Sequence, residues 1–120
     1  MAERVIIAIP TFRRPKSLLR LLEALARLDT KADIAVLVAD NDAAGQKGLK
    51  LCAELAPQYR WPLRAVLARE RGIAQVRNML VAEALRDPKA AFIAMIDDDE
   101  WPHPQWISQF LAAQDRKSVV

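Results

Sequence analysis

Glycine, cysteine and histidine are scarce in this sequence, and their scarcity excludes several kinds of site. The three glycines form neither a G-x-G-x-x-G nor a Walker A loop, which argues against a dinucleotide oxidoreductase and a P-loop nucleotide hydrolase. The single cysteine, Cys52, excludes an internal disulfide and a cysteine-based zinc site, and we expect it to be a buried core residue. The single histidine, His103, gives little support to a histidine-based triad, and we interpret it as a surface residue.

Long apolar runs and an N-terminal leader are also missing. The uncharged stretches 5–12 and 90–96 are far shorter than the roughly 20 apolar residues that a transmembrane helix needs. Residues 1–4 lack the basic, apolar and small-residue regions of a signal peptide, so we expect a cytoplasmic protein. Because 52% of the residues are hydrophobic and no low-complexity run occurs, residues 1–120 are predicted to fold as one globular domain.

The charge is basic overall but unevenly distributed. The chain has 18 Lys and Arg residues against 15 Asp and Glu, which gives a net charge of +3. Four of the acidic residues are consecutive, from Asp97 to Glu100, so the rest of the chain is strongly basic. This pattern fits a nucleic-acid binder, or a phosphate-bearing ligand held with a metal ion. No RNP-like or helix-turn-helix signature is present, which argues against nucleic acid, and Trp61, Trp101 and Trp106 are expected to be packing groups.

Apolar runs alternate with segments of helical periodicity four times along the chain. The predicted strands are residues 4–9, 33–39, 62–68 and 90–96. The predicted helices are residues 18–28, 45–56, 73–86 and a last one from Pro104. In the third helix, Ile73, Val76 and Leu80 are expected to face inward. Strands that are apolar throughout and alternate with helices indicate an α/β fold, a mostly parallel β-sheet with helices on both faces. Ligands of such sheets bind outside the carboxyl ends of the strands.

Asp97, Asp98 and Asp99 directly follow the fourth predicted strand. Three adjacent carboxylates repel one another, so the cluster is unfavourable unless something neutralises it. Mg²⁺ or Mn²⁺ would do so, because these ions bind through one or two carboxylates together with phosphate oxygens. Asp97 and Asp99 can converge on one ion, while Asp98 can reach a ribose hydroxyl. The alternative is a solvated acidic turn that caps the following helix.

The first and second predicted strands also end in candidate groups. Asp40 closes the second strand, where a carboxylate can accept hydrogen bonds from a nucleoside; the alternative is an Asx turn or a helix cap. Thr11 and Arg13 follow the first strand, and the guanidinium group of arginine suits phosphate. For Arg14 and Lys16 a solvated position is the better interpretation.

A further group of candidates surrounds Gly72, which lets the backbone approach a ligand before the third helix begins. Arg71 precedes this glycine, and Arg77 and Asn78 lie about one turn into the helix. The alternative for Arg77 is an ordinary exposed helical arginine.

Taken together, these segments resemble the nucleotide-binding half of family 2 glycosyltransferases, the inverting enzymes with the GT-A fold. The matching segments are 9–15 (IPTFRRP), 38–42 (VADND), 70–78 (ERGIAQVRN) and 92–102 (FIAMIDDDEWP). They span nearly the whole chain, and the pattern is most similar to bacterial exopolysaccharide enzymes of the succinoglycan glucosyltransferase type.

The resemblance implies a Rossmann-like GT-A nucleotide-diphospho-sugar transferase fold with a site for a nucleotide-sugar donor, UDP-sugars being favoured. The implied donor-binding residues are Pro10, Thr11, Arg13, Asp40, Asp42, Arg71, Arg77, Asn78 and Asp98. Asp97 and Asp99 would form a DxD-type element that holds Mn²⁺ or Mg²⁺. The implied reaction is transfer of the sugar, with inversion, to a glycan or lipid-linked acceptor.

Members of this family are typically much longer, and their second half carries the acceptor site and a general base. We therefore expect residues 1–120 to be the N-terminal nucleotide-sugar-binding part of a longer enzyme, a truncated fold that is inactive alone. The base would lie beyond Val120, and the full-length protein would be peripheral to the inner face of the cytoplasmic membrane. The alternatives are a nucleotidyltransferase of related fold, whose usual glycine-rich loop is missing here, and a non-catalytic nucleotide-sugar-binding module.

Overall fold

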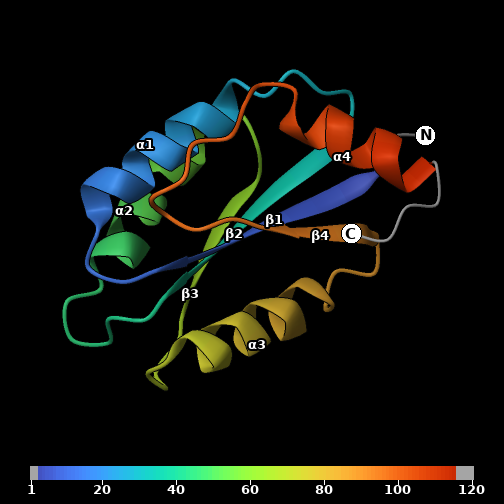
Figure 1. Cartoon of the computed structure of the whole chain (residues 1–120). Coiled ribbons are helices and arrows are strands. Elements are labelled where there is room, and N and C mark those ends of the chain that lie inside the picture. The colour runs from blue at the N-terminus through green and yellow to red at the C-terminus, as the bar shows by residue number, and fades with distance from the viewer. Residues whose placement is uncertain (1–2, 116–120) are drawn as a thin grey trace.

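Four strands form a single sheet in the order β3-β2-β1-β4, with every neighbouring pair parallel (Figure 1). The computed structural model describes residues 3–115. The strands are β1 (Arg4–Thr11), β2 (Asp33–Asp40), β3 (Leu63–Leu67) and β4 (Ala90–Met95). The apolar runs of the sequence therefore predicted all four strands, and the parallel sheet is confirmed.

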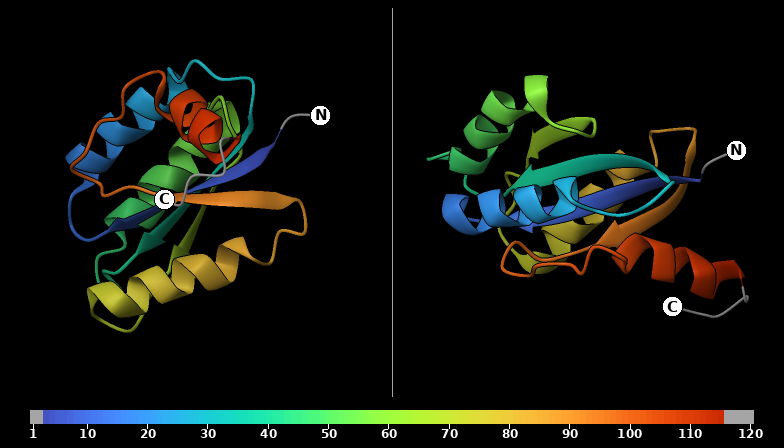
Figure 2. Two further views of the ribbon diagram at one scale, coloured as in Figure 1. Left: turned by 45° about the vertical axis from the view of Figure 1, so that its right-hand side comes forward. Right: turned by 90° about the horizontal axis from the view of Figure 1, so that it is seen from above.

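A helix follows each strand, and the helices cover both faces of the sheet. They are α1 (Pro15–Ala26), α2 (Lys47–Leu55), α3 (Ile73–Ala84) and α4 (Trp106–Asp115), with a short 3-10 turn, η1 (Ala56–Gln58), after α2. The helices α1, α2 and α4 lie on one face and α3 lies alone on the other, in all views (Figures 1 and 2). The prediction of an α/β fold with helices on both faces is confirmed.

The alternation of side chains along β1 divides the interior into two cores. Val5, Ile7 and Ile9 point toward the leucines of α1, whereas Ile6 and Ala8 point toward α3. Cys52 and Ile107 join the first of these cores, so the expected burial of the cysteine is confirmed. Because β1 is central and buried on both faces, its residues from Val5 to Ile9 are all apolar instead of alternating between apolar and polar.

Three expectations about single residues are wrong. β1 does not stop at Pro10 but continues to Thr11. The pairing of β1 with β4 ends at Ala8, so Pro10 pairs with β2 alone, and a proline is tolerated where one side of the strand is unpaired. Ile73 is 76% exposed, since it is the first residue of α3 and borders an open pocket rather than the sheet. Trp101 is 58% exposed and does not pack, unlike Trp61 and Trp106.

Candidate functional site

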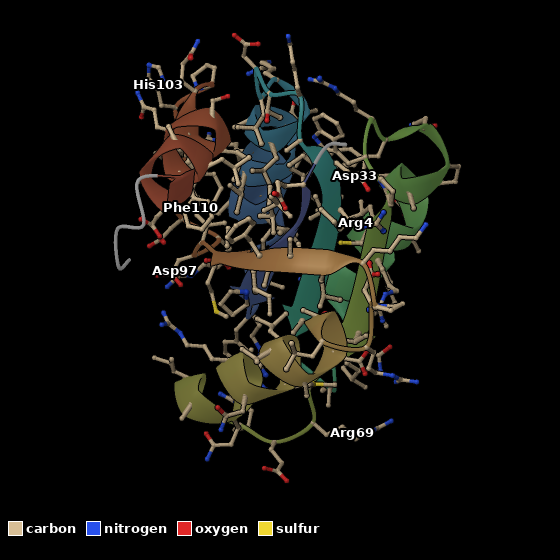
Figure 3. All side chains as sticks on the ribbon, turned by 90° about the vertical axis from the view of Figure 1, so that its right-hand side faces the viewer. Arg4, Asp33, Arg69, Asp97, His103 and Phe110 are labelled. Atoms are coloured by element: carbon tan, nitrogen blue, oxygen red, sulfur yellow. The ribbon has the colours of Figure 1, made fainter. Side chains whose placement is uncertain are left out.

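A pocket of about 650 Å³ lies at the carboxyl ends of the strands. Its walls come from the loop after β1, from Asn41 after β2, from the start of α3 and from the acidic segment after β4. Arg4 and Asp33, which form an ion pair, lie at the opposite end of the sheet from Asp97 (Figure 3). The position of the pocket is the one that the strand pattern predicts for a ligand of a parallel sheet.

Most of the predicted site residues converge on this pocket, although they are distant in the sequence. Those that line it are Pro10, Thr11, Arg71, Arg77, Asp97, Asp98 and Asp99. Those that do not line it are Arg13, Asp40, Asp42 and Asn78. Asn78 is exposed on α3, while the other three stabilise the loops around the pocket.

Asp98 is the buried member of the acidic cluster. Its Oδ2 atom accepts a hydrogen bond of 2.9 Å from the Thr11 hydroxyl, which ties the end of β1 to the segment after β4. Burial raises the pKa of Asp98 above its ordinary value, and the neighbouring Asp99 carboxylate adds to the effect. The Thr11 hydroxyl, the Arg14 charge and the backbone N–H of Phe12 oppose this increase. The carboxylate is therefore held in one orientation, at the floor of the pocket.

Two arginines neutralise the exposed carboxylates of the cluster. The Nη1 atom of Arg14 lies 3.4 Å from Oδ2 of Asp99 and 3.5 Å from Oδ1 of Asp98. On the other side, Nη2 of Arg77 lies 3.5 Å from Oδ1 of Asp97. The two arginine side chains and the Asp97 and Asp99 side chains are about half exposed, whereas Asp98 is buried. Exposed ion pairs of this length contribute little stability. The Asp97 and Asp99 carboxylates thus remain available to a ligand.

Arg14 and Phe12 are pocket residues that the sequence interpretation missed. Arg14 is exposed, as expected of a solvated residue, but the parallel pairing of β1 with β4 also brings it to the acidic cluster. The Phe12 ring lies between two guanidinium groups, with Cζ of Arg71 at 4.2 Å and Cζ of Arg13 at 4.9 Å from its centroid. An aromatic residue directly after a buried strand, between Thr11 and two arginines, was the available signal for this position.

The donor set fits a divalent cation that arrives together with a phosphate ligand. Within residues 3–115, no three His, Cys, Asp or Glu side chains are arranged as a preformed metal site. Mg²⁺ and Mn²⁺ do not require one, because they commonly bind one or two carboxylates and complete their coordination with phosphate oxygens and water. Asp97 and Asp99 line the same pocket and supply such carboxylates.

Asp40 and Asp42 are occupied by contacts within the chain. Asp40, which is buried, accepts hydrogen bonds from the backbone N–H of Asp42 at 2.9 Å and of Leu49, in the first turn of α2, at 3.0 Å. It is therefore both an Asx turn and a helix cap, the alternative that the sequence left open. The backbone N–H of Gly45 lowers the pKa of Asp42 most, and Arg13, with Nε 3.3 Å from Oδ2, lowers it further.

Fold and pocket together define an α/β domain with a pocket lined by charged residues at the carboxyl ends of a parallel sheet. The model of the family "Glycosyl transferase family 2" matches residues 6–120, and the chain belongs to this family. The family resemblance of the four sequence segments is thereby confirmed.

Two curated proteins are similar in sequence to this chain. The succinoglycan biosynthesis protein ExoM of Rhizobium meliloti (strain 1021) is 31% identical over 107 residues, which cover 88% of this chain and 33% of that protein. A chondroitin synthase of Escherichia coli is 29% identical over 121 residues, which cover 95% of this chain and 16% of that protein. The chain therefore spans a third or less of the length of these relatives.

Solved structures share the fold. S. aureus TarS 1-349 in complex with UDP has a TM-score of 0.77 at 21% identity, over 94% of this chain and 32% of that one. The mannosyltransferase PcManGT from Pyrobaculum calidifontis, in complex with GDP-Man and Mn²⁺, has a TM-score of 0.65 at 23% identity, over 88% of this chain and 30% of that one. These matches confirm the predicted GT-A fold.

No helix within residues 3–115 has both the length and the apolar character needed to cross a membrane.

Proposed function

We propose that this chain is the donor-binding part of a glycosyltransferase and binds a nucleoside-diphosphate sugar, together with a divalent cation, in the pocket at the strand ends. The observation that carries the proposal is the convergence of an aromatic ring, three arginines and three carboxylates on one pocket. Its volume of about 650 Å³ lies within the range of small-molecule sites, about 300–1,000 Å³. The bound nucleotides named for the structural relatives, UDP and GDP-Man, support this ligand class, and we favour a UDP-sugar.

Each wall of the pocket has a proposed task. Phe12 contacts Arg71 and Arg13, and a nucleobase would stack on its ring in place of the exposed Arg13 side chain. Asp98 is fixed by Thr11 and accepts a hydrogen bond from a ribose hydroxyl. Pro10, near the end of β1, adds an apolar surface to the pocket.

The arginines and the exposed carboxylates would act on the diphosphate. Arg14 and Arg77 are about half exposed and their ion pairs are long, 3.4–3.5 Å, so they can turn from the carboxylates toward phosphate oxygens at little cost. Asp97 and Asp99 would hold Mn²⁺ or Mg²⁺, which when bound offsets the charge of the diphosphate and of the departing nucleoside diphosphate.

The predicted residues outside the pocket receive a supporting task. Asp40 fixes the start of α2, and the pair of Arg13 and Asp42 joins the loops after β1 and β2. Asn78 is exposed and does not line the pocket, and we assign it no contact with the donor.

We further propose that the reaction needs the remainder of a longer protein, because this chain spans a third or less of the curated relatives that it matches. That remainder would supply the acceptor site and the general base, beyond Val120. The acceptor hydroxyl of a glycan or lipid-linked sugar would attack from the face opposite the diphosphate and invert the anomeric carbon. The proposed location is the cytoplasm, at the inner face of the membrane. Residues 1–120 alone would bind donor without transferring it.

Calorimetry with UDP, GDP and dTDP, each with and without Mn²⁺, tests the donor site. We expect UDP to bind and Mn²⁺ to strengthen binding, because the ion bridges the diphosphate to Asp97 and Asp99. If Mn²⁺ enhances binding of none of the three nucleotides while circular dichroism shows an intact fold, the proposal is wrong. Tighter binding of nucleoside triphosphates than of diphosphates would instead support a nucleotidyltransferase.

The variant Asp99→Ala tests the metal site separately. We expect it to abolish the Mn²⁺ enhancement and to leave the melting temperature nearly unchanged, because this side chain is 58% exposed and paired only with Arg14 among the described residues. The matched control is Glu23→Ala, which removes one exposed negative charge from α1, outside the pocket. If Asp99→Ala unfolds the protein, the acidic cluster is structural.

A further inference from the structure

Asn41 uses its whole side-chain amide to hold one loop of the pocket. Its Nδ2 atom donates hydrogen bonds to the carbonyl oxygens of Ala68 and Glu70, each at 2.8 Å. Its Oδ1 atom accepts a longer bond, 3.4 Å, from the backbone N–H of Gly72. The side chain is buried at the end of β2 and therefore cannot exchange these partners freely for water.

The two ends of the loop have other contacts, since the backbone N–H of buried Ala68 donates to the Asp40 carbonyl and the Gly72 carbonyl accepts from Val76, whereas the residues between them are exposed. Residues 69–72 are exposed, and Arg69 lies at the outside of the molecule (Figure 3). Gly72 has φ of 127°, a conformation that favours glycine, and a Cβ atom there would lie 2.2 Å from Oε1 of Gln75. Residues 69–72 therefore bury little surface, although Gly72 has no room for a side chain, and the hydrogen bonds from Asn41 fix the path of this turn.

The held loop carries the arginine that covers Phe12. The guanidinium carbon of Arg71 lies 4.2 Å from the Phe12 ring centroid, so the position of the loop decides whether this wall of the pocket forms. An asparagine suits the task because it has two donors for the two carbonyl groups and one acceptor for the N–H group. An ionised aspartate of the same shape has acceptors only and would repel both carbonyl oxygens.

We propose that Asn41 is a positioning residue of the donor pocket: it fixes residues 68–72 and so places Arg71 against Phe12. The effect on nucleotide binding rests on the proposed function, whereas the placement of the loop rests on the contacts of Asn41 alone. Asn41 is therefore required for affinity although its own amide is occupied by the loop.

The test compares the Asn41→Asp variant with the unmodified chain by three measurements. The first is the NMR ring-current shift of the Arg71 side-chain protons above Phe12, which we expect to collapse. The second is tryptic cleavage after Arg69 and Arg71 under native conditions, which should rise about tenfold, the factor expected when modest hydrogen bonds are lost. The third is the affinity for UDP with Mn²⁺, which should fall by a similar factor.

Two variants control for charge and for folding. Gln58→Glu makes the same amide-to-carboxylate change at an exposed site outside the pocket and should alter none of the three measurements. Asn41→Ala removes the amide without adding charge, so it should shift all three measurements in the same direction and replaces the aspartate variant if that one does not fold.

The outcomes separate this inference from the proposed function. If the Asn41 variants keep the ring-current shift, the cleavage rate or the UDP affinity of the unmodified chain, Asn41 is not a positioning residue. If the unmodified chain itself binds no nucleotide, the proposed function fails, and the first two measurements still decide whether Asn41 places the loop.

Discussion

The hydrogen bond between Thr11 and Asp98 makes a specific prediction about stability and its dependence on pH. Both side chains are buried, and the Thr11 hydroxyl is the donor, at 2.9 Å from Oδ2. The variant Thr11→Val keeps the branched shape and the methyl group that packs against Gly48, where a Cβ atom would come within 2.9 Å of it. It removes the donor alone, so the measured change reports the hydrogen bond rather than a cavity.

The expected loss is about 1.5–3 kcal/mol in the free energy of unfolding near neutral pH, the typical contribution of a hydrogen bond to a charged group. Burial raises the folded-state pKa of Asp98 above its ordinary value of 3.8. The stability that this group contributes is therefore fully present below about pH 3.8 and is lost as the pH rises through the folded-state pKa. Thr11 opposes the increase. The valine variant therefore has a still higher pKa and loses more stability between acid and neutral pH.

Urea denaturation at neutral pH and near pH 4 measures the effect. The difference in unfolding free energy between Thr11→Val and the unmodified chain should be largest at neutral pH. It should shrink in acid toward about 0.5–1.5 kcal/mol, the contribution of a hydrogen bond between neutral groups. Thr11→Ser keeps the donor and should restore the pH dependence of the unmodified chain. A valine variant of unchanged stability, or a difference that does not shrink in acid, would show that the Thr11 hydroxyl does not stabilise the ionised Asp98 carboxylate.

Two further predictions concern the larger core. Burial, and secondarily the charge of Asp40, raise the pKa of the Cys52 thiol to about 12. A thiol reagent should therefore react slowly with the folded protein near pH 8 and rapidly after unfolding in urea. Fast reaction of the folded protein would contradict this burial. Ile7 is fully buried in the central strand. Ile7→Ala should lower the free energy of unfolding, measured by urea titration, by about 2–5 kcal/mol. A loss well below ~1 kcal/mol would contradict the packing of this residue.

The strands and helices were predictable because burial imposes a period on the sequence. The leucines of α1 and the apolar residues of β1 repeat as a helix face and as a strand buried on both sides, respectively. Exceptions occur where the chain leaves the sheet: Ile73 continues the period of α3 but lies beyond the surface that this helix covers.

The composition of the pocket was predictable in part, because functional side chains gather at the strand ends. What the sequence could not supply is which strand ends are neighbours. Arg14 reaches Asp99 only because β4 pairs with β1, and these residues are 85 positions apart. The role of Asn41 has no sequence signature, since its partners include backbone carbonyl groups that any residue possesses.

The most direct test of the central claim, that the strand-end pocket binds a nucleotide, is an NMR titration of the isotope-labelled chain with UDP and Mg²⁺. We expect the amide signals of residues 11–14, 70–73 and 97–99 to shift together with a single affinity. Those around the smaller pocket at residues 29–32 and 108–112 should stay unchanged. Shifts confined to that smaller pocket, or no shifts at saturating nucleotide, would contradict it.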